Sequence, residues 1–270
     1  MILIVGHVSK NNERQDVVIL NNYFYNGNMK LGIIGCTGRL ATEIINLINK
    51  SNDYELTAAI ARNGNARVGE KILCNNNSVE ITTDLDDCST CDVLIDVATR
   101  DSCLNNLKKY KQLKKPLIIG TTGFSREEIL SIEKTAELFP ICMSSNFSEE
   151  LIFFIEAVKA YSKLTNIVDA NIMEYHHVNK KDIPSGTALM IKDAILQANK
   201  NISVYIHSVR AGNIKGEHTV LFTNTFGEEI IFTHKASDRS VFAQGILKTA
   251  LKLTNLKNGI YSFKDILLNN

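Results

Sequence analysis

The sequence predicts an α/β protein in which a helix-covered parallel sheet is followed by a second region that mixes helices with a separate sheet. Three observations support this prediction. Short apolar runs alternate with stretches of helical spacing from Lys30 to about residue 138. A glycine-rich turn, Gly35 to Gly38, joins the first apolar run to the first helical stretch. After about residue 148 the pattern changes, and residues 203–234 predict several strands with no helix between them.

The first half of the chain predicts a series of strand–helix–strand units. Residues 31–34 form a short apolar run that ends at Gly35, which is typical of a buried parallel strand. Apolar residues then recur at helical spacing over residues 38–50. The continued alternation favours right-handed crossovers and a parallel sheet covered on both faces. Further strands are predicted at 54–61, 79–82, 92–98, 117–119 and 140–143, and helices at about 101–113 and 125–138.

The second half of the chain has a different pattern. A helix is predicted near residues 148–162, a long strand at 167–175 and, after a polar loop, a helix starting near Pro184. The strands of residues 203–234 follow, and residues 240–254 are again helical. Successive strands without intervening helices are typical of a mixed or antiparallel sheet, so a second, α+β domain is predicted here.

Length and composition exclude several classes of protein. A chain of 270 residues is long enough for one large or two modest domains. The net charge of +1 provides no basic field for nucleic acid or an anionic membrane surface. No apolar run approaches the roughly 18 residues that span a bilayer, and the initial MILIV is too short for a secretory signal. We therefore expect a cytoplasmic protein without nucleic-acid or membrane partners.

The six cysteines include one C-x-x-C pair, Cys88 and Cys91. A structural zinc site usually has a second pair of ligands at similar spacing, and the sequence has none. A cytosolic chain also keeps its thiols reduced. We therefore expect two ordinary thiols in a loop before a strand, and no bound metal.

Residues 1–28 differ from the rest of the chain, since they are rich in Asn and stop just before a second methionine, Met29. The first strand pattern begins directly after it. We expect this segment to be a dispensable extension of unknown role, or Met29 to be the true start. An added strand at residues 17–20 is an alternative with no identified pairing partner.

The turn from Gly35 to Leu40 lies where a dinucleotide-binding fold requires glycine. There the backbone must approach the pyrophosphate, and free N–H groups at a helix N-terminus favour its negative charge. The spacing is G-x-x-G without the usual third glycine, so tight strand–helix packing is the alternative explanation. The position within a strand–helix–strand unit favours a Rossmann-like nucleotide domain.

The end of the second predicted strand normally selects the cofactor. An acidic residue there would bind the ribose hydroxyls of NAD. The stretch at residues 59–63 reads AIARN and has no acid, and Arg62 is placed to meet a 2′-phosphate. We therefore expect NADPH to be preferred over NADH. An exposed loop arginine without a ligand is the alternative.

Two clusters of glycine, hydroxyl and amide residues follow predicted strands, at residues 120–124 (GTTGF) and 144–147 (SSNF). Ligands of an open parallel sheet lie beyond the carboxyl ends of its strands, so both clusters are candidates for the nicotinamide side. Ordinary turn chemistry is the alternative, because Gly, Ser and Asn dominate turns.

Residues 174–188 (EYHHVNKKDIPSGTA) hold the densest set of chemical groups in the chain. Histidine titrates near neutrality and is the usual proton carrier, and a nearby lysine supplies a cation for a carboxylate. The N–H groups of Gly186 and Thr187 at a helix start can bind an anion. Together these groups predict an enzyme that adds a proton to a small carboxylate substrate.

Each of these groups has a simpler explanation when it is taken alone. His176 and His177 are adjacent, so in an extended segment they point to opposite sides and one of them can be a packing histidine. The i, i+4 or i, i+2 spacing of a typical metal-binding histidine pair is absent. Residues 185–187 can be only a helix cap. The density of these groups within one short segment argues against the simpler explanations together.

The sequence resembles the dihydrodipicolinate reductases, which are 4-hydroxy-tetrahydrodipicolinate reductases of the diaminopimelate branch of lysine biosynthesis. The motifs that carry the resemblance cover about residues 29–270 and are, in order, GCTGRL, GTTGF, SSNFS, EYHHVNKKDIPSGTA, RAGNIKGEHT and THKASDR. The segment that runs from the paired histidines to PSGTA is the most specific of them. The resemblance implies reduction of 4-hydroxy-tetrahydrodipicolinate to tetrahydrodipicolinate by hydride transfer from NADPH, with NADH as the alternative cofactor.

The resemblance also assigns roles to individual residues. His176 and Lys180 match the family's two proton donors. His177, Gly186 and Thr187 match the positions that hold the carboxylates of the substrate. The cofactor-binding positions are Gly35, Cys36, Thr37, Gly38, Arg39, Leu40, Arg62, Gly120, Thr121, Thr122, Ser144, Ser145, Asn146 and Phe147.

The resemblance further implies a domain arrangement and an assembly. Residues 29–147 and 240–270 would form the dinucleotide-binding domain. Residues 148–239 would form an inserted α+β domain for substrate binding and oligomerisation, in a homotetramer.

Three positions depart from the family pattern. Ala41 replaces the last glycine of the usual G-R-M-G loop, a small change. Ala61 stands where members that use NADH well carry an acid, which puts NADH use in doubt. Glu149 replaces a common glycine after Asn-Phe-Ser and can alter the hinge between the domains.

Two rival functions remain open at this point. A different two-domain NAD(P)-dependent dehydrogenase, such as an amino-acid dehydrogenase, would explain the glycine loop but not the PSGTA segment. A redox-sensing NADP-binding protein without turnover is the non-enzyme alternative, and it would be expected to have a degraded segment 174–188.

Overall fold

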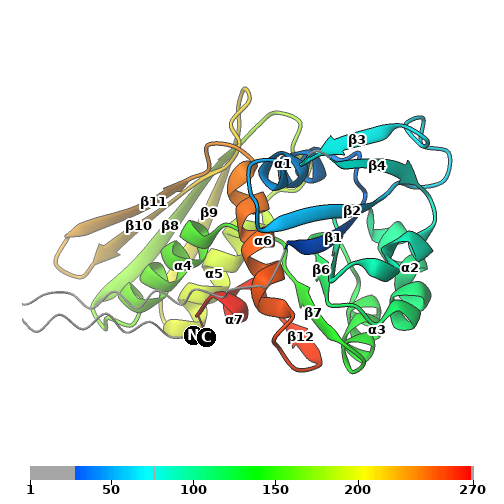
Figure 1. Ribbon diagram of the computed structural model, residues 1–270. Helices are drawn as coiled ribbons and strands as arrows, with labels where there is room; N and C mark the ends of the chain where they lie inside the picture. The colour runs from blue at the N-terminus through cyan, green and yellow to red at the C-terminus, as the bar shows by residue number, and fades with distance from the viewer. Residues whose placement is uncertain (1–27, 76, 269–270) are drawn as a thin grey trace, which may run out of the picture.

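The computed structural model describes residues 28–75 and 77–268. These residues form two lobes, each built around its own sheet, and α6 (Ser240–Leu253) lies where the lobes meet (Figure 1). The larger lobe contains an eight-stranded sheet and the smaller lobe a four-stranded sheet. The predicted fold class, a Rossmann-like domain with a second α+β unit, is confirmed. The predicted N-terminal extension lies outside the described residues, except for Asn28.

The larger sheet is parallel except at one edge. Its strands are β1 (Met29–Ile34), β2 (Tyr54–Ile60), β3 (Lys71–Cys74), β4 (Asn77–Thr82), β5 (Val93–Asp96), β6 (Leu117–Ile119), β7 (Pro140–Met143) and β12 (Gly259–Tyr261). They lie in the order β12-β7-β6-β5-β1-β2-β4-β3, and only β3 is antiparallel to its neighbour.

The direction of strand addition reverses between β1 and β5. From β1 the chain continues to β2 and β4 on one side, and it then returns to β5 on the other side of β1. A crevice forms at such a reversal, beyond the carboxyl ends of the two central strands, and it is the usual ligand position in open parallel sheets. The loops that follow Ile34 and Asp96 therefore lie side by side at this crevice.

Helices cover both faces of the larger sheet, because alternate side chains of each strand point to opposite faces. Leu31 and Ile33 enter a core formed with α1, α6 and α7, whereas Ile34 enters a second core formed with α2 and α3. In the described part of the chain, no helix combines the length and the apolar character needed to cross a bilayer. The bounds of these helices are α1 (Arg39–Ile48), α2 (Arg100–Leu113), α3 (Arg126–Ala136) and α7 (Phe263–Leu268).

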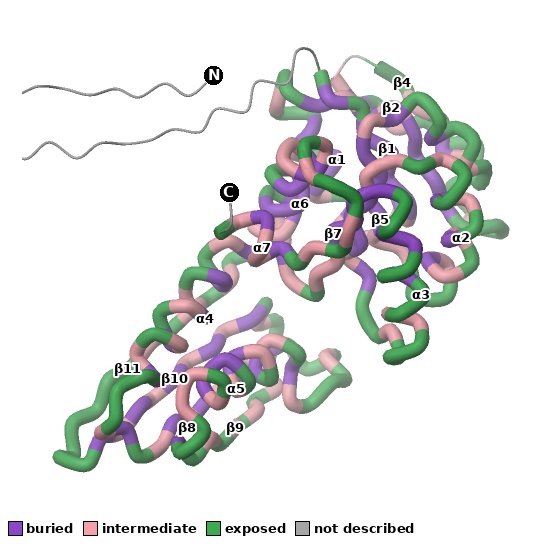
Figure 2. The backbone as a smooth tube through the Cα atoms, turned by 90° about the horizontal axis from the view of Figure 1, so that it is seen from below, coloured by how far each residue is buried: buried purple, intermediate pink, exposed green. Residues whose placement is uncertain are grey.

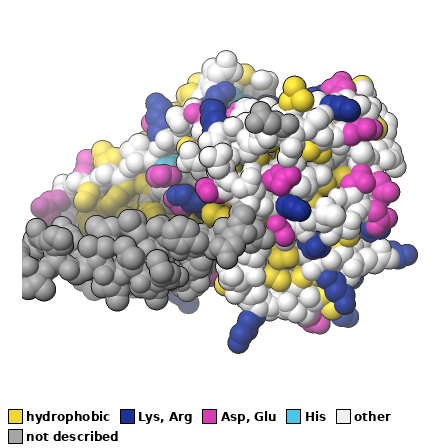
Figure 3. Space-filling model, in the orientation of Figure 1, with side chains coloured by type: hydrophobic (Ala, Val, Ile, Leu, Met, Phe, Trp, Pro, Cys, Tyr) yellow, Lys and Arg dark blue, Asp and Glu magenta, His cyan; other side chains and the backbone are white. Residues whose placement is uncertain are grey.

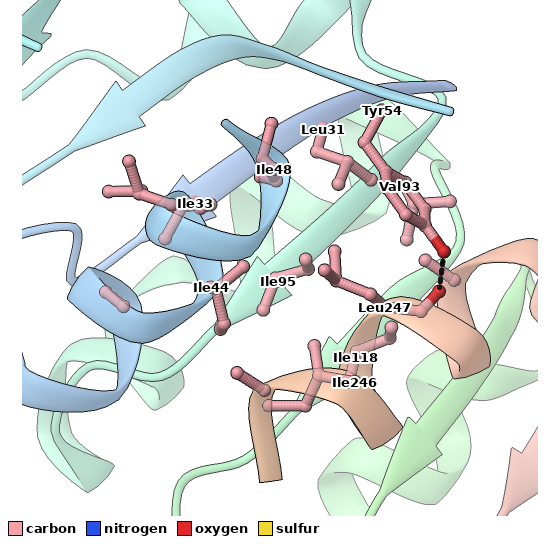
Figure 4. Packing of buried hydrophobic residues seen from close by; sticks show 14 of the residues in the cluster. Leu31, Ile33, Ile44, Ile48, Tyr54, Val93, Ile95, Ile118, Ile246 and Leu247 are labelled. Carbon is pink, nitrogen blue, oxygen red and sulfur yellow. Dashed lines mark hydrogen bonds between the residues drawn. The ribbon is translucent and has the colours of Figure 1, made fainter. Parts of the chain in front are cut away.

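The first of these cores joins segments that are far apart in the sequence (Figure 4). Ile44 of α1 and Ile246 of α6 pack over Ile95 of β5, and all three are fully buried. Full burial of an isoleucine side chain contributes about 2 kcal/mol. The hydroxyl group of Tyr54 donates a hydrogen bond to the carbonyl oxygen of Leu247 at 3.1 Å, which satisfies the one polar atom of that ring. The helix α6 is therefore an integral part of the larger lobe.

The smaller lobe has a mixed sheet with helices on one face only. Its elements are α4 (Glu149–Tyr161), β8 (Ile167–His176), α5 (Gly186–Ala198), β9 (Ser203–Arg210), β10 (Glu217–Asn224) and β11 (Glu229–Lys235). The strand order is β11-β10-β8-β9, in which only β8 and β9 are parallel to each other. The helices α4 and α5 pack on residues such as Ile172 and Phe222.

No helix among residues 28–75 and 77–268 covers the opposite face of the smaller sheet (Figure 2). Its side chains include Tyr205, Val209 and Ile231, which are 53%, 38% and 61% exposed. Their neighbours along the strands, such as Ile206 and Phe232, point to the helix-covered core instead. This alternation leaves exposed apolar side chains on the outer side of the sheet, among polar ones such as His207 and Asn171.

Four short elements were not predicted from the sequence: β3, the 3-10 helix Leu85–Thr90, β12 and α7. They have four, six, three and six residues, too few to display a period. The prediction of a loop around Cys88 and Cys91 was therefore wrong for Cys88, which lies within the 3-10 helix. Both thiols are free and fully buried.

Candidate active site

A cleft of about 760 Å³ opens at the reversal between β1 and β5. Its walls come from the turn after β1, the segment after β2 and the start of α2. Four predicted cofactor residues line it, namely Gly35, Thr37, Gly38 and Arg62. The N-terminus of α1 begins at the same turn, so backbone N–H groups and the helix dipole favour an anionic ligand there. The size and polarity of this cleft fit a dinucleotide.

Gly35 allows the backbone to turn tightly at the floor of the cleft. Its φ is +83°, and an added Cβ would lie 2.7 Å from the Cα of Ala98. A side chain there would collide with backbone, which cannot move aside as a flexible side chain can. The N–H of Gly35 donates to the carbonyl oxygen of Ile60 at 2.8 Å. The turn is therefore held by this hydrogen bond to β2 and by its close contact with Ala98 after β5.

Three residues of the predicted glycine loop do not line the cleft. Cys36 is buried in the core, and Leu40 packs against the same core. Arg39 is exposed at the start of α1. Any contribution of these three residues to cofactor binding would come from their backbone or, for Arg39, from a side chain that turns toward the ligand.

Arg62 lies exposed at the edge of the cleft, directly after β2. Its neighbour Ala61 is buried, so no acidic side chain stands at the end of this strand. The segment is tied to the glycine turn because Asn65 donates from Nδ2 to Oγ1 of Thr37 at 3.1 Å. The cleft therefore presents a cation, and no carboxylate at this strand end, where the adenosine ribose of a dinucleotide would lie.

Gly120, Thr121 and Thr122 follow β6, and they adjoin the loop after β5. Oγ1 of Thr121 lies 3.4 Å from the carbonyl oxygen of Ala98 and 3.5 Å from Oδ1 of Asp96. Asp96 also accepts a hydrogen bond from the hydroxyl of Tyr110 at 2.6 Å. Thr122 is exposed beside them. The ends of β5 and β6 are thus linked by buried hydrogen bonds. Gly120, Thr121 and Thr122 do not line the 760 Å³ cleft.

Ser144, Ser145, Asn146 and Phe147 follow β7. Oγ of Ser144 donates to the carbonyl oxygen of Asn146 at 2.7 Å, which closes a tight turn. The ring of Phe147 is buried against Phe263, with centroids 5.2 Å apart. Ser145 reaches the other lobe, because its Oγ lies 3.6 Å from Sδ of Met190 on α5. This loop therefore connects the larger lobe to the helix whose N-terminus was predicted to bind carboxylates.

His176 lies at the end of β8 and its ring contacts a buried carboxylate. Nδ1 of His176 lies 2.5 Å from Oε2 of Glu174, although the N–H direction is too oblique for a well-aligned hydrogen bond. Oε1 of the same carboxylate accepts from Nη2 of Arg210 at 2.9 Å. On the other side of the ring, a Cβ added at Gly216 would lie 3.3 Å from Nε2 of His176. His176 is 7% exposed and Glu174 is fully buried.

The start of α5 joins this cluster through its cap. Oγ of Ser185 accepts from the N–H of Ala188 at 3.2 Å and lies 3.3 Å from Nε2 of His218. Ser185 therefore links the cap of α5 to the His218 ring, and a hydroxyl can serve as donor or acceptor in that contact. Gly186 and Thr187, the predicted carboxylate-binding residues, form the first turn of α5 directly after this cap.

His177 and Lys180 complete the predicted set. His177 is half-buried and follows β8 directly. Nζ of Lys180 forms an ion pair with Oδ2 of Asp182 at 2.9 Å, and the carbonyl oxygen of Asp182 accepts from Nη2 of Arg210 at 2.7 Å. The structure therefore brings His176, Lys180 and the start of α5 together around one charged cluster.

The electrostatics of this cluster follow from burial and neighbouring charge. Burial lowers the pKa of His176 below its usual value, the carboxylate of Glu174 opposes that shift, and Lys180 adds to it. Burial would raise the pKa of Glu174, but hydrogen bonds from Arg210 and Ser208 outweigh it and lower the pKa to about 2. Burial lowers the pKa of His218 to about 3. At neutral pH Glu174 is therefore charged and His218 is neutral.

One group of side chains in the described part of the chain could also hold a metal ion. Glu174, His176 and His218 offer ligand atoms that all lie within 4.8 Å of one another. However, Arg210 already hydrogen-bonds to the carboxylate, and Lys180 adds a second positive charge. These charges oppose a divalent cation, so the group is better suited to proton transfer.

Glu174, Arg210 and His218 were not among the predicted site residues. One signal was available in the sequence, because residues two apart on a strand share a face, as Glu174 and His176 do. The other two contacts depend on strand register, in which Arg210 pairs with His176 and His218 with Glu174. No local pattern in the sequence specifies that register.

Charged side chains show no single-sign patch on the face of the larger lobe that Figure 3 displays. Lys and Arg side chains are interleaved there with Asp and Glu side chains. This agrees with the net charge of +1.

Two family models match consecutive parts of the chain. The model described as "Dihydrodipicolinate reductase, N-terminus" matches residues 29–147. The model described as "Dihydrodipicolinate reductase, C-terminus" matches residues 151–267. Together they cover most of the chain in the expected order.

Curated relatives carry one name over nearly the full chain. A 4-hydroxy-tetrahydrodipicolinate reductase from Buchnera aphidicola subsp. Schizaphis graminum is 36% identical over 264 residues, covering 88% of this chain and 96% of the relative. A protein of the same name from Caldanaerobacter subterraneus subsp. tengcongensis is 34% identical over 256 residues, covering 88% of this chain and 98% of the relative.

Solved structures share the fold. A dipicolinate-bound dihydrodipicolinate reductase from Paenisporosarcina sp. TG-14 has a TM-score of 0.70 at 19% identity, covering 87% of this chain and 97% of that chain. A probable dehydrogenase from Thermotoga maritima has a TM-score of 0.64 at 10% identity, covering 89% and 93%. At these identities the likeness concerns the fold alone.

Proposed function

Because this chain belongs to the dihydrodipicolinate reductase family, we propose that it reduces 4-hydroxy-tetrahydrodipicolinate to tetrahydrodipicolinate in the diaminopimelate pathway of lysine biosynthesis. It is an NAD(P)H-dependent oxidoreductase. The observation that carries the proposal is the cluster around His176, in which a proton carrier, a lysine and a capped helix N-terminus adjoin one another. Such a set matches a small dicarboxylate that must receive a proton.

Different residues of the chain have different roles in this reaction. The cofactor supplies the hydride when it is bound at the cleft beyond β1 and β5. His176 donates a proton to the ring as negative charge develops there, and Lys180 is the second proton donor. His177, Gly186 and Thr187 hold the carboxylates, since the partial positive charge at the N-terminus of α5 favours an anion there. One hydride and one proton enter the ring, and the hydroxyl group leaves as water together with one hydrogen of the substrate ring.

Cofactor turnover tests this function. The substrate is generated in situ by the preceding synthase from pyruvate and aspartate semialdehyde, and loss of reduced nicotinamide absorbance is followed with NADPH and with NADH. Turnover that depends on the synthase supports the assignment. A folded protein that binds NADPH but does not oxidise it would reject the reductase function and revive the sensor or the other dehydrogenase.

Arg62 is proposed to bind the 2′-phosphate of NADPH, since it is the cation at the end of β2 where no acid is present. Replacing Arg62 with Ala is expected to raise KM for NADPH about 30-fold, because a charge-assisted hydrogen bond contributes about 2 kcal/mol. KM for NADH is expected to change less than about threefold. Arg126→Ala, an exposed arginine on α3, is the matched control. Equal changes for both cofactors would refute the role.

Residues 29–147 and 240–270 are proposed as the dinucleotide-binding domain, and residues 148–239 as the substrate-binding and oligomerisation domain of a homotetramer. The outer face of the smaller sheet supports this, because large apolar side chains such as Val209 and Ile231 are exposed together on it. Tyr205 lies on that face and is 53% exposed in the single chain.

Introducing a charge on this face tests the assembly. Tyr205→Asp is expected to convert tetramers to smaller species in sedimentation equilibrium, because burying an unpaired carboxylate between sheets costs several kcal/mol. Leu73→Asp is the control, since Leu73 is 77% exposed on β3 in the other lobe. A wild-type protein that sediments as a monomer at micromolar concentration would contradict the homotetramer.

A further inference from the structure

The carboxylate of Glu174 contacts side chains or backbone from several elements at once. It is fully buried in the middle of the smaller sheet, two residues before the end of β8. Oε2 lies 2.5 Å from Nδ1 of His176, and Oε1 accepts from Nη2 of Arg210 at 2.9 Å. Oε1 also accepts from the backbone N–H of Ser185 at 3.3 Å. One side chain therefore joins β8, β9 and the cap of α5.

The strand registers explain why these groups meet at Glu174. Glu174 and His176 are two residues apart on β8 and so point to the same face. Arg210 is the partner of His176 on β9, and His218 is the partner of Glu174 on β10. The rings of His176 and His218 lie edge to face with centroids 5.2 Å apart. The carboxylate thus occupies the centre of a layer formed by three adjacent strands.

Both candidate proton donors are connected to this carboxylate. His176 contacts it directly. Lys180 is connected through Asp182, whose side chain pairs with Lys180 and whose carbonyl oxygen accepts from Arg210. Arg210 completes the connection, because the same Nη2 donates to Glu174. Loss of the carboxylate would therefore release the ring of His176 and the loop that carries Lys180 together.

We propose that Glu174 is a positioning residue that fixes the ring of His176, the Lys180 loop and the N-terminus of α5 in one geometry, so that proton donation and carboxylate binding coincide. This inference rests on the proposed function, because it gives His176 and Lys180 the roles assigned above. It does not make Glu174 a catalytic residue, since the carboxylate is buried behind the ring.

The charges that face His176 determine how its protonation responds. Glu174 is the negative group in contact with the ring, Lys180 and Arg210 are positive, and His218 is neutral. Burial lowers the pKa of His176, and Glu174 opposes that lowering. A neutral residue at position 174 would therefore lower the pKa of His176 further. An enzyme that needs the protonated ring would then lose activity at a lower pH than the wild type.

Glu174→Gln tests the positioning role, because the amide keeps the size of the side chain and removes its charge. We expect kcat to fall about 100-fold, KM for the dicarboxylate to change less than about fivefold, and the Kd of NADPH to remain unchanged. The descending limb of the pH profile of kcat is expected to move to lower pH. Asp193→Asn, an exposed carboxylate on α5, is the matched control and is expected to behave as wild type.

Glu174→Asp keeps the charge but shortens the side chain. In this variant the descending limb of the pH profile is expected to return to its wild-type position, while kcat stays reduced. The comparison distinguishes the effect of the carboxylate charge from the effect of side-chain length, even if Glu174→Gln is unstable. A wild-type kcat and pH profile in Glu174→Gln would overturn the proposal, and so would a loss of thermal stability with an unshifted pH limb. Titration of the His176 ring by NMR provides a readout that does not need turnover, so an inactive wild type would reject the proposed function separately.

Discussion

Replacing His176 with Gln is expected to lower kcat about 1000-fold, because the variant lacks the ring that is proposed to protonate the substrate and that contacts the buried Glu174 carboxylate. Glutamine approximates the size of the ring and can still hydrogen-bond to the carboxylate, so the sheet around it should remain intact. Its amide cannot donate a proton to a developing carbanion at neutral pH. The loss should therefore appear in kcat and not in the binding of either ligand.

Steady-state kinetics and cofactor binding check this prediction together. KM for the substrate is expected to stay within about threefold of the wild type, and the Kd of NADPH from fluorescence titration should not change. His177→Gln is the matched control, because the adjacent ring belongs to the carboxylate-binding set. It is expected to raise KM more than it lowers kcat. A His176→Gln enzyme that keeps more than about a tenth of the wild-type kcat would exclude His176 as the proton donor.

The periodic parts of the fold were predictable because their signals are local. Residues 117–119 were predicted as a strand with the bounds that β6 has, and the predicted helix at 101–113 differs from α2 by one residue. The edge strands β3 and β12 were missed because such short runs are stabilised by pairing with a neighbour and not by their own pattern. The sequence contains no information on that pairing that a window of a few residues can capture.

The candidate site likewise has parts that could be predicted from the sequence and parts that could not. The glycine turn at Gly35 and the helix start at Gly186 were predictable, because each depends on backbone geometry within a few residues. The contacts of Glu174 with Arg210 and His218 were not, because they depend on the register of three strands. A register shift of one residue would turn the carboxylate to the exposed face of the sheet. The residues that place the proton donor are thus specified only by the assembled fold.

The segment at Phe147 joins the two lobes, and α6 is in direct van der Waals contact with it. Phe147 ends the loop after β7, and Ser148 caps α4 of the smaller lobe. Across this segment Oε2 of Glu149 accepts from Nζ of Lys248 on α6 at 2.6 Å. Glu149, at the position of a common glycine, was expected to alter the hinge, and its side chain forms this ion pair. The exposed pair contributes at most about 1 kcal/mol, so close packing must fix the segment.

Gly245→Ala is expected to destabilise the protein by about 3 kcal/mol, because a Cβ at this position would lie 1.8 Å from the carbonyl oxygen of Phe147. The collision is with backbone, and Cζ of Phe263 lies only 3.0 Å away on another side. The helix or the connecting segment must therefore shift. Alanine is otherwise favoured over glycine within a helix by about 1 kcal/mol, so a net loss can be attributed to the contact.

Thermal unfolding measures the effect, and a loss of 3 kcal/mol corresponds to a decrease of about 9 °C in Tm for a chain of this size. Gly186→Ala is the matched control for stability, because nothing lies within 4 Å of an added Cβ at the start of α5. Its Tm is expected to stay within about 2 °C of the wild type. An unchanged Tm in Gly245→Ala would mean that α6 does not pack on Phe147 as closely as described.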